Sequence, residues 1–244
     1  MKALVSADEQ GGVLSIWREA LGIIRRYPLA SFSPAAVLGT LGAVPYYFIE
    51  GKTHVTEVIL ASLTQAFAYY LYIVYVAYAE EVTAEAERGA ERITTLGALR
   101  MLRRAHPVVP SAMAASVAAI LIPRAAALLL AIPGLWVLTR WSLFAPVIGR
   151  EHLGPVAALR RSNELVRGRF ELVFLTAASA TVLEEVAVHA GGAAGLLATG
   201  SDTWGQWLGS SIATLLTMPL AALATSVTYI HLAARTERLK GPRR

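Results

Sequence analysis

The chain contains no cysteine among its 244 residues. A disulfide framework and a thiolate metal site are therefore excluded. Charge is also scarce, because only 16% of the residues are Asp, Glu, Lys or Arg, whereas a typical soluble domain has about a quarter. Hydrophobic residues make up 55% of the chain, and its mean hydropathy is +0.52. This balance indicates an integral membrane protein.

The few charges are distributed so that long apolar runs remain. Residues 29–49, 58–79 and 203–230 are runs of 21, 22 and 28 residues without a charged side chain. About 20 apolar residues suffice to cross a hydrocarbon core roughly 30 Å thick. The stretch 107–149 is interrupted by only two arginines, so it can hold two spans. A turn between them is expected at Ile132-Pro133-Gly134.

We therefore predict an all-α fold, a polytopic membrane helix bundle that forms one domain over residues 1–244. The six expected spans are about 29–49, 58–79, 107–131, 134–149, 170–199 and 204–231. Amphipathic helices at the cytoplasmic interface are expected at about 12–26, 85–104 and 155–168. The first 28 residues lack the apolar core of a signal peptide, so the first span is expected to direct insertion.

Basic residues gather on one side of this predicted topology. Of the 22 Lys and Arg residues, 19 lie in the segments 1–28, 80–106, 150–169 and 235–244. The two opposite loops contain only Lys52. The positive-inside rule then places both termini of this multi-pass chain in the cytoplasm. The expected location is the inner membrane of a bacterial cell.

A short motif suggests an internal repeat. The pattern A-L-x-x-x-R-R occurs at residues 20–26 and 98–104, and Ala158-Leu159 begins a third segment with a similar basic end. Each copy would be one surface helix followed by two spans, which makes the three units parallel repeats. The abundance of Ala, Leu and Arg in this chain is an equally good explanation.

Ionisable residues within the predicted spans are candidates for a polar site. They are Arg124, Arg140, Glu184, Glu185 and His189. Helix rise places Arg140 about 15 Å and Glu184 about 22 Å from the cytoplasmic side. Such residues could bind an ion, a proton or a lipid headgroup, although snorkelling or fixing of helix register explains them more simply. No cofactor is expected. Glu-x-x-x-His matches neither the H-E-x-x-H zinc pattern nor the Glu-x-x-His of di-iron bundle sites, so no metal is expected either.

Tyrosines are concentrated in the second expected span. Tyr75 and Tyr78 can belong to the aromatic belt at the cytoplasmic interface. Tyr69, Tyr70 and Tyr72 would lie deeper, where their hydroxyl groups need partners. The pattern favours packing of this span inside the bundle.

The string G-P-x-x-A-L-x-R-S-x-x-L-x-x-G occupies residues 154–168. With Ile132-Pro133-Gly134 and the following span, it resembles the membrane domain associated with glycerophosphoryl diester phosphodiesterases and related bacterial multi-span families. The resemblance implies a helical membrane domain linked to lipids or lipid breakdown products. The catalytic His, Glu and Asp residues of the soluble phosphodiesterase barrel have no matching positions here, so no active site can be assigned.

The same string has a physical interpretation as an elbow that could also bind lipid headgroups. Its candidate residues are Pro155, Arg160, Arg161, Ser162, Arg167 and Gly168. Proline suits the first turn of a helix, and the glycine allows a turn into the next span. Ser162 and Asn163 could bond neighbouring helix ends. The expected inward stripe comprises Val156, Leu159, Asn163 and Val166.

The sequence favours a non-enzymatic integral membrane protein, a scaffold or accessory partner in lipid-related or transport processes. The alternative is a transporter or channel built around Arg140, Glu184 and Glu185. An enzyme acting on lipid is a third possibility, but its catalytic residues would have to come from scattered candidates. Expected partners are the bilayer, anionic lipid headgroups and a membrane protein. Nucleic acid is not expected, because the basic residues flank spans and belong to no recognition fold.

Overall fold

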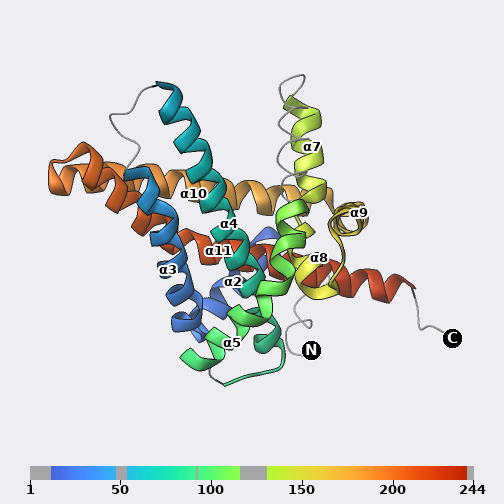
Figure 1. Ribbon diagram of the computed structural model, residues 1–244. Helices are drawn as coiled ribbons and strands as arrows, with labels where there is room; N and C mark the ends of the chain where they lie inside the picture. The colour runs from blue at the N-terminus through green and yellow to red at the C-terminus, as the bar shows by residue number, and fades with distance from the viewer. Residues whose placement is uncertain (1–11, 48–53, 92, 116–130, 241–244) are drawn as a thin grey trace.

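The structure is a computed structural model that describes residues 12–47, 54–91, 93–115 and 131–240. These residues form helices and no strand (Figure 1), which confirms the all-α prediction. The helices are α2 (Val13–Arg26), α3 (Pro28–Tyr47), α4 (His54–Glu87), α5 (Thr95–Ala105), the 3-10 helix η1 (His106–Val108), α7 (Ala131–Trp141), α8 (Phe144–Glu151), α9 (Pro155–Val166), α10 (Phe170–Thr199) and α11 (Asp202–Lys240).

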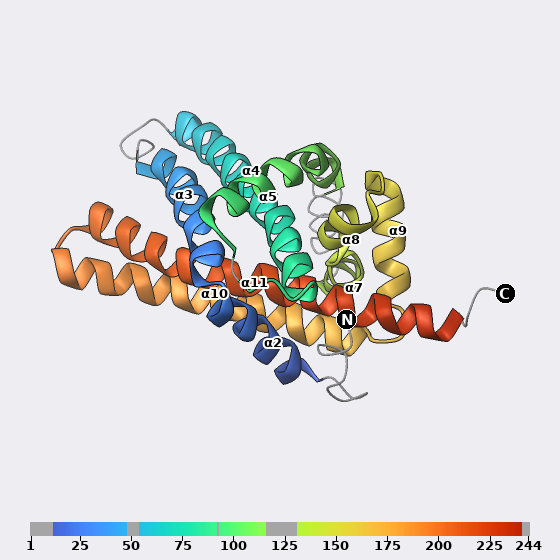
Figure 2. The same ribbon diagram turned by 90° about the horizontal axis from the view of Figure 1, so that it is seen from below.

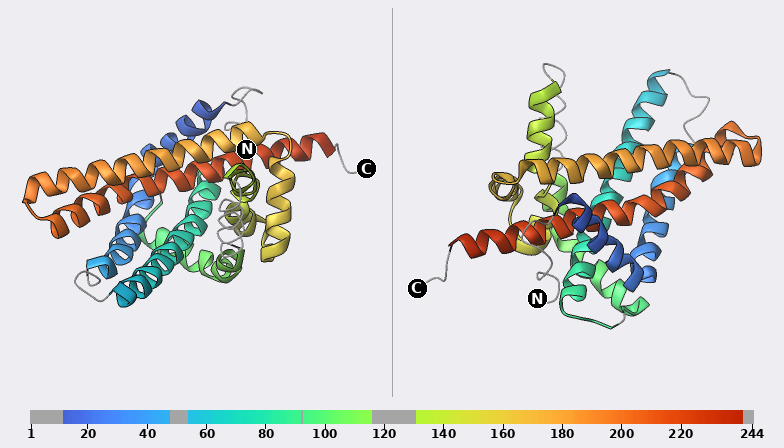
Figure 3. Two further views of the ribbon diagram at one scale, coloured as in Figure 1. Left: turned by 90° about the horizontal axis from the view of Figure 1, so that it is seen from above. Right: turned by 180° about the vertical axis from the view of Figure 1, so that it is seen from behind.

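The helices α10 and α11 form a long antiparallel hairpin (Figures 1 and 3). Glycines at four-residue spacing, Gly191 and Gly195 on α10 and Gly205 and Gly209 on α11, let the two backbones approach closely. A Cβ atom built on Gly195 would lie 2.7 Å from the carbonyl carbon of Gly205, and one on Gly191 would lie 3.0 Å from that of Gly209. Small residues at this spacing are typical of helix pairs that pack inside membranes.

A second hairpin, formed by α3 and α4, packs against α11. The two hairpins cross, and α7 also projects away from the α10–α11 hairpin, so these helices do not form a bundle of parallel rods (Figures 1 and 3). The amphipathic helix α2 packs obliquely against the α10–α11 hairpin (Figures 2 and 3). Its Trp17 donates a hydrogen bond of 3.0 Å to Ser179 of α10.

Two tyrosines of α4 hold α3 in place. Pro34 has no N–H, so it leaves the carbonyl of Ala30 without its helical donor. The hydroxyl of Tyr78 donates a hydrogen bond of 2.8 Å to that carbonyl. The hydroxyl of Tyr75 donates one of 2.7 Å to the backbone carbonyl of Ser31. Both rings are almost completely buried. Tyr75 and Tyr78, which could belong to an aromatic belt, are therefore packed inside the protein.

The three expected amphipathic helices are present, with one change of bounds. The segments predicted at 12–26 and 155–168 correspond to α2 and α9. The segment predicted at 85–104 does not begin as expected, because α4 continues to Glu87 and a turn at Gly89, which has a φ of 78°, precedes α5. The threefold repeat stays a prediction.

The predicted span 134–149 is broken into α7 and α8 at Ser142 and Leu143. Pro146 explains the break, because it cannot donate a hydrogen bond to the carbonyl of Ser142 and its ring disfavours a continuous helix there. The turn predicted at Ile132-Pro133-Gly134 is also wrong. These residues belong to the first turn of α7, where proline is tolerated.

Two helices among the described residues are long and apolar enough to cross a membrane: Phe170–Thr199 and Trp204–Arg238. They correspond to the last two predicted spans. The described apolar part of α3, Pro28–Leu38, is shorter than a span. Residues 116–130, which include Arg124 and most of the third predicted span, lie outside the described residues. Six transmembrane helices are therefore not confirmed.

Candidate functional site

A buried ionic cluster joins α4 and α8. The Arg150 guanidinium lies 3.0 Å from Glu80 through Nε and 2.9 Å from Glu87 through Nη1, and its Nη2 donates a 2.8 Å hydrogen bond to Thr83. Ser226 of α11 donates a short hydrogen bond to the second oxygen of Glu80. Glu80, Thr83 and Glu87 share one face of α4 because their spacings of three and seven residues follow the helical repeat.

Glu80 is the most deeply buried acidic residue of this cluster, with 2% of its surface exposed. It directly follows the predicted span 58–79 in the sequence. Burial raises the pKa of the Glu80 carboxyl, and the charge of Arg150 and the hydrogen bond from Ser226 oppose this rise. Gly149 lets α8 approach, since a Cβ atom there would lie 3.1 Å from Cγ of Glu80. The cluster fixes three helices relative to one another.

A second polar network continues from the same end of α8. Glu151 accepts hydrogen bonds of 3.1 and 3.2 Å from Nε of Arg161 on α9 and one of 3.0 Å from the hydroxyl of Tyr229 on α11. On the other side of α11, Nε2 of His231 lies 2.8 Å from a carboxylate oxygen of Glu19 on α2. These contacts attach α2, α8 and α9 to α11.

A single side chain of α9 forms hydrogen bonds with the backbone on both sides of the break between α7 and α8. The hydroxyl of Ser162 donates a 2.8 Å hydrogen bond to the carbonyl of Arg140 and accepts one of 3.2 Å from the backbone N–H of Leu143. Both backbone groups lie beside the break, where helical partners are missing. The prediction that Ser162 bonds a neighbouring helix end is therefore confirmed.

Arg140 lies at the junction of α7 and α9. Its Nη1 donates a 2.8 Å hydrogen bond to Asn163, and its guanidinium carbon lies 3.9 Å from the ring centroid of Trp136. Its Nε is buried and has no hydrogen-bond partner among the described residues. A buried donor without an acceptor is uncommon in native structures and calls for an explanation such as an ordered water or ion.

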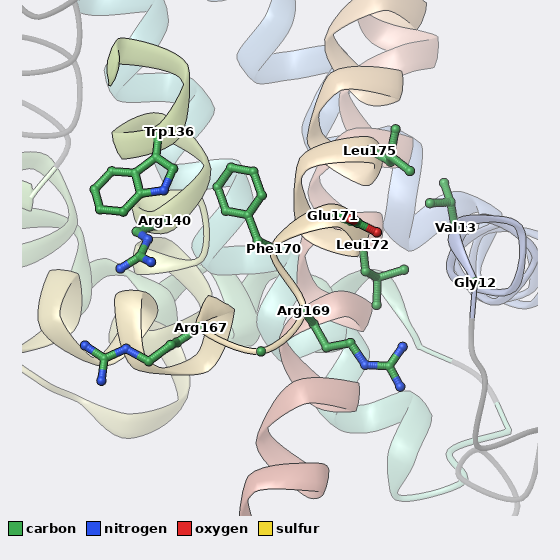
Figure 4. Close-up of a pocket in the computed structure, with 11 residues that line it drawn as sticks. Gly12, Val13, Trp136, Arg140, Arg167, Arg169, Phe170, Glu171, Leu172 and Leu175 are labelled. Carbon is green, nitrogen blue, oxygen red and sulfur yellow. The ribbon is translucent and has the colours of Figure 1, made fainter. Parts of the chain in front are cut away.

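Arg140 also lines a pocket of about 680 Å³ between α7, the start of α10 and the start of α2. Figure 4 shows Arg140 beneath Trp136 and beside Phe170, whereas Arg167 and Arg169 extend in opposite directions from the turn before α10. The lining residues are Gly12, Val13, Trp136, Arg140, Arg167, Gly168, Arg169, Phe170, Glu171, Leu172 and Leu175. Three arginines against one glutamate make the pocket cationic, and most of its other side chains are apolar.

The structure does not assemble the predicted intramembrane site. Among the described residues no ion pair joins Arg140 to Glu184 or Glu185, and Arg140 instead donates a hydrogen bond to Asn163 of α9. His189 lies 3.7 Å from Glu185, one helical turn away, and both side chains are largely exposed. Arg124 lies outside the described residues.

The predicted elbow residues have separate roles. Pro155 begins α9 and Gly168 lies in the turn before α10, as expected. Arg161 pairs with Glu151, Arg160 is exposed on α9, and Arg167 lines the pocket. Arg161 and Ser162 therefore join helices, Arg167 and Gly168 line the pocket, and Arg160 does neither.

The predicted inward stripe of α9 needs a correction. Val156 is 72% exposed, because the first turn of α9 faces outward. The buried face comprises Ala158, Leu159, Ser162, Leu165 and Val166. The inward stripe therefore shares only Leu159 and Val166 with the predicted one.

The sequence interpretation missed two features that had a local signal. The glycine pairs of α10 and α11 have the G-x-x-x-G spacing, and Pro146 marks the break inside a predicted span. The Glu80–Arg150 pair had no local signal, because 70 residues separate its members. No group of three potential metal ligands occurs in the part of the chain that the structure describes.

Known proteins provide no further guide to this site. The chain was compared with family models, with curated proteins and with solved structures. None of the three comparisons finds a match. The resemblance to phosphodiesterase-associated membrane domains stays a prediction, and the function has to be argued from the geometry.

Proposed function

We propose that this chain is a non-enzymatic integral membrane protein that acts as a scaffold or accessory partner in lipid-related or transport processes. The observation that supports this proposal is the exposed apolar surface of α10. Only 11% of its most apolar stretch is buried, compared with 61% for α11. An exposed surface of this kind in a long apolar helix is unfavourable in water and favourable in lipid.

The exposed surface contains large aliphatic side chains along the length of α10. Val182 and Val186 are 61% and 62% exposed, and Leu197 near the end of the hairpin is 86% exposed. Helix α11 adds Leu208 and Ile212, which are about half exposed. The α10–α11 hairpin therefore offers a continuous surface for acyl chains.

The proposed topology has six spans in a bacterial inner membrane, with both termini in the cytoplasm. Its support is the charge distribution, since 19 of 22 basic residues lie in the four segments assigned to one side. The proposed partners are the bilayer, anionic lipids and another membrane protein. The amphipathic helices α2, α5 and α9 would lie at the cytoplasmic interface.

Alkaline carbonate extraction of membranes from expressing cells tests this proposal. We expect the chain to remain in the membrane pellet, because apolar spans resist an extraction that removes peripheral proteins. Release of the wild-type chain into the soluble fraction would contradict a membrane-spanning role. The variant Val182→Glu plus Val186→Glu is expected to lower the amount of protein that inserts and reaches the pellet, since a charge within a span costs about 2.5–3.5 kcal/mol.

The matched control is Val156→Glu plus Ala157→Glu. These substitutions add the same charges to exposed positions of α9. The control is expected to remain in the pellet with the wild-type chain. Equal release of both double variants would show that added charge alone, not its place on α10, causes the loss.

A further inference from the structure

The pocket between α7, α10 and α2 combines positive charge with an apolar wall. Arg140, Arg167 and Arg169 supply positive charge, while Trp136, Phe170, Leu172 and Leu175 supply an apolar wall. We propose that this pocket binds one anionic phospholipid, with the phosphate at the arginines and an acyl chain along α10. The proposal rests on the membrane location proposed above and names the ligand that the scaffold would hold.

The polar half of the pocket is suited to a phosphate group. Arg140 lines the pocket, and its guanidinium carbon lies 3.9 Å from the ring centroid of Trp136. Arginine binds phosphate oxygens through several parallel N–H groups. The guanidinium of Arg169 forms no hydrogen bond or ion pair with the described residues. Arg140 and Arg169 lie on opposite sides of the turn before α10 (Figure 4), so they offer donors to different edges of the pocket.

The start of α10 adds to the positive potential. Arg169 precedes its first turn, and no side chain caps that turn. Uncapped N–H groups and the helix dipole favour an anion at this end of a helix. Glu171 lies in the same turn and opposes an anion, but the three arginines outnumber it. The pocket as a whole therefore favours a negative ligand.

The apolar half of the pocket distinguishes a lipid from a free phosphate. Leu175 lines the pocket, and Val182 and Val186 follow it on one side of α10 at spacings of seven and four residues. All three side chains are more than half exposed. The stripe extends about 16 Å from Leu175 to Val186 at the rise of an α-helix. A diacyl lipid can occupy the arginines and this stripe together.

Native mass spectrometry of the full chain in detergent tests the proposal. Phosphatidylglycerol, phosphatidylcholine, inorganic phosphate and glycerophosphoglycerol, the deacylated headgroup, serve as probes. We expect one phosphatidylglycerol to bind per chain. Arg169→Gln and Arg140→Gln should each weaken it about tenfold, because each removes a charge-assisted hydrogen bond. The control Arg160→Gln removes an exposed arginine of α9 that does not line the pocket and should bind as the wild type does.

The outcomes separate the possible ligands. The proposal would be overturned if phosphatidylcholine bound as tightly as phosphatidylglycerol. It would also be overturned if Arg160→Gln and Arg169→Gln lost lipid affinity equally, or if both pocket variants bound lipid as the wild type does. Displacement of the lipid by millimolar inorganic phosphate or glycerophosphoglycerol would identify a soluble phosphate ligand and would overturn it too. Arg169→Gln keeps the test valid if Arg140→Gln disturbs the contact with Asn163. Retention of every variant in carbonate-washed membranes would show that the membrane proposal stands even where lipid binding fails.

Discussion

Leucine in place of Gly195 is expected to separate α10 from α11 and to lower the free energy of unfolding by about 3 kcal/mol or more. The carbonyl carbon of Gly205 lies 2.7 Å from where even a Cβ atom would be placed, and the backbone N of Gly209 lies 3.1 Å away. These neighbours are backbone atoms of another helix, so they cannot move as a side chain would. The hairpin can accept the larger residue only by opening.

The measurement is unfolding by sodium dodecyl sulfate in mixed micelles, followed by tryptophan fluorescence. The matched control is Ala194→Leu, which adds a similar side chain to the exposed side of the same turn of α10. Leucine also favours helix more than glycine does, so intrinsic propensity acts against the expected loss. An equal, small effect of the two substitutions would mean that the close approach of the helices does not stabilise the fold.

Removal of Arg150 is expected to have a comparable effect. Arg150→Ala leaves Glu80 buried with a negative charge and without its ionic partner, which typically costs about 3–5 kcal/mol. The double variant Glu80→Leu plus Arg150→Met should cost less than the sum of the single losses in Glu80→Leu and Arg150→Met, because it removes both charges together. Glu87 then remains, and it is exposed enough to be hydrated.

The control for this cycle is Arg88→Ala. Arg88 pairs with Glu85 at 2.7 Å on the surface, where its side chain is 61% exposed. Surface pairs contribute about 0–1 kcal/mol, so little change is expected. Simple additivity of the Glu80→Leu and Arg150→Met losses would contradict the coupling inferred from the structure. The same unfolding assay provides all of these values.

The sequence predicted those elements whose limits depend on local patterns. The span at 170–199 agrees with α10 because a glycine turn precedes it and Gly200, with a φ of 67°, ends it. Helix α9 begins at Pro155 for an equally local reason, the fit of proline to a first helical turn. Amphipathic periodicity likewise predicted α2.

Contacts between distant segments could not be predicted in the same way. The depth assigned to Arg140 assumed a continuous helix to Gly149, and the break before Pro146 removed that assumption. The break also brought Arg140 next to Asn163, so that one residue of the predicted intramembrane site lines a pocket with Arg167 of the predicted elbow. Only the three-dimensional path of the chain brings these residues together.

The ionic cluster of Glu80 and Arg150 also depends on distant segments, so the sequence did not predict it. Glu80 closes a charge-free run, which suggests a solvated helix end, and Arg150 begins a basic segment. In the structure each compensates the burial of the other. The cluster lies apart from the pocket residues, so a structural role for Glu80 and Arg150 and a binding role for Arg140 and Arg169 can be tested by separate variants.

Spin-label accessibility on α10 tests the central claim, that its exposed apolar face lies in lipid. The chain has no cysteine, so single cysteines at Val182, Val186 and Arg160 can each carry a label without background. In native-like bilayers, labels on α10 should collide often with oxygen, which concentrates in lipid, and rarely with a water-soluble nickel chelate. The label at Arg160 should show the opposite pattern. Frequent collision of the α10 labels with the nickel chelate would contradict the claim.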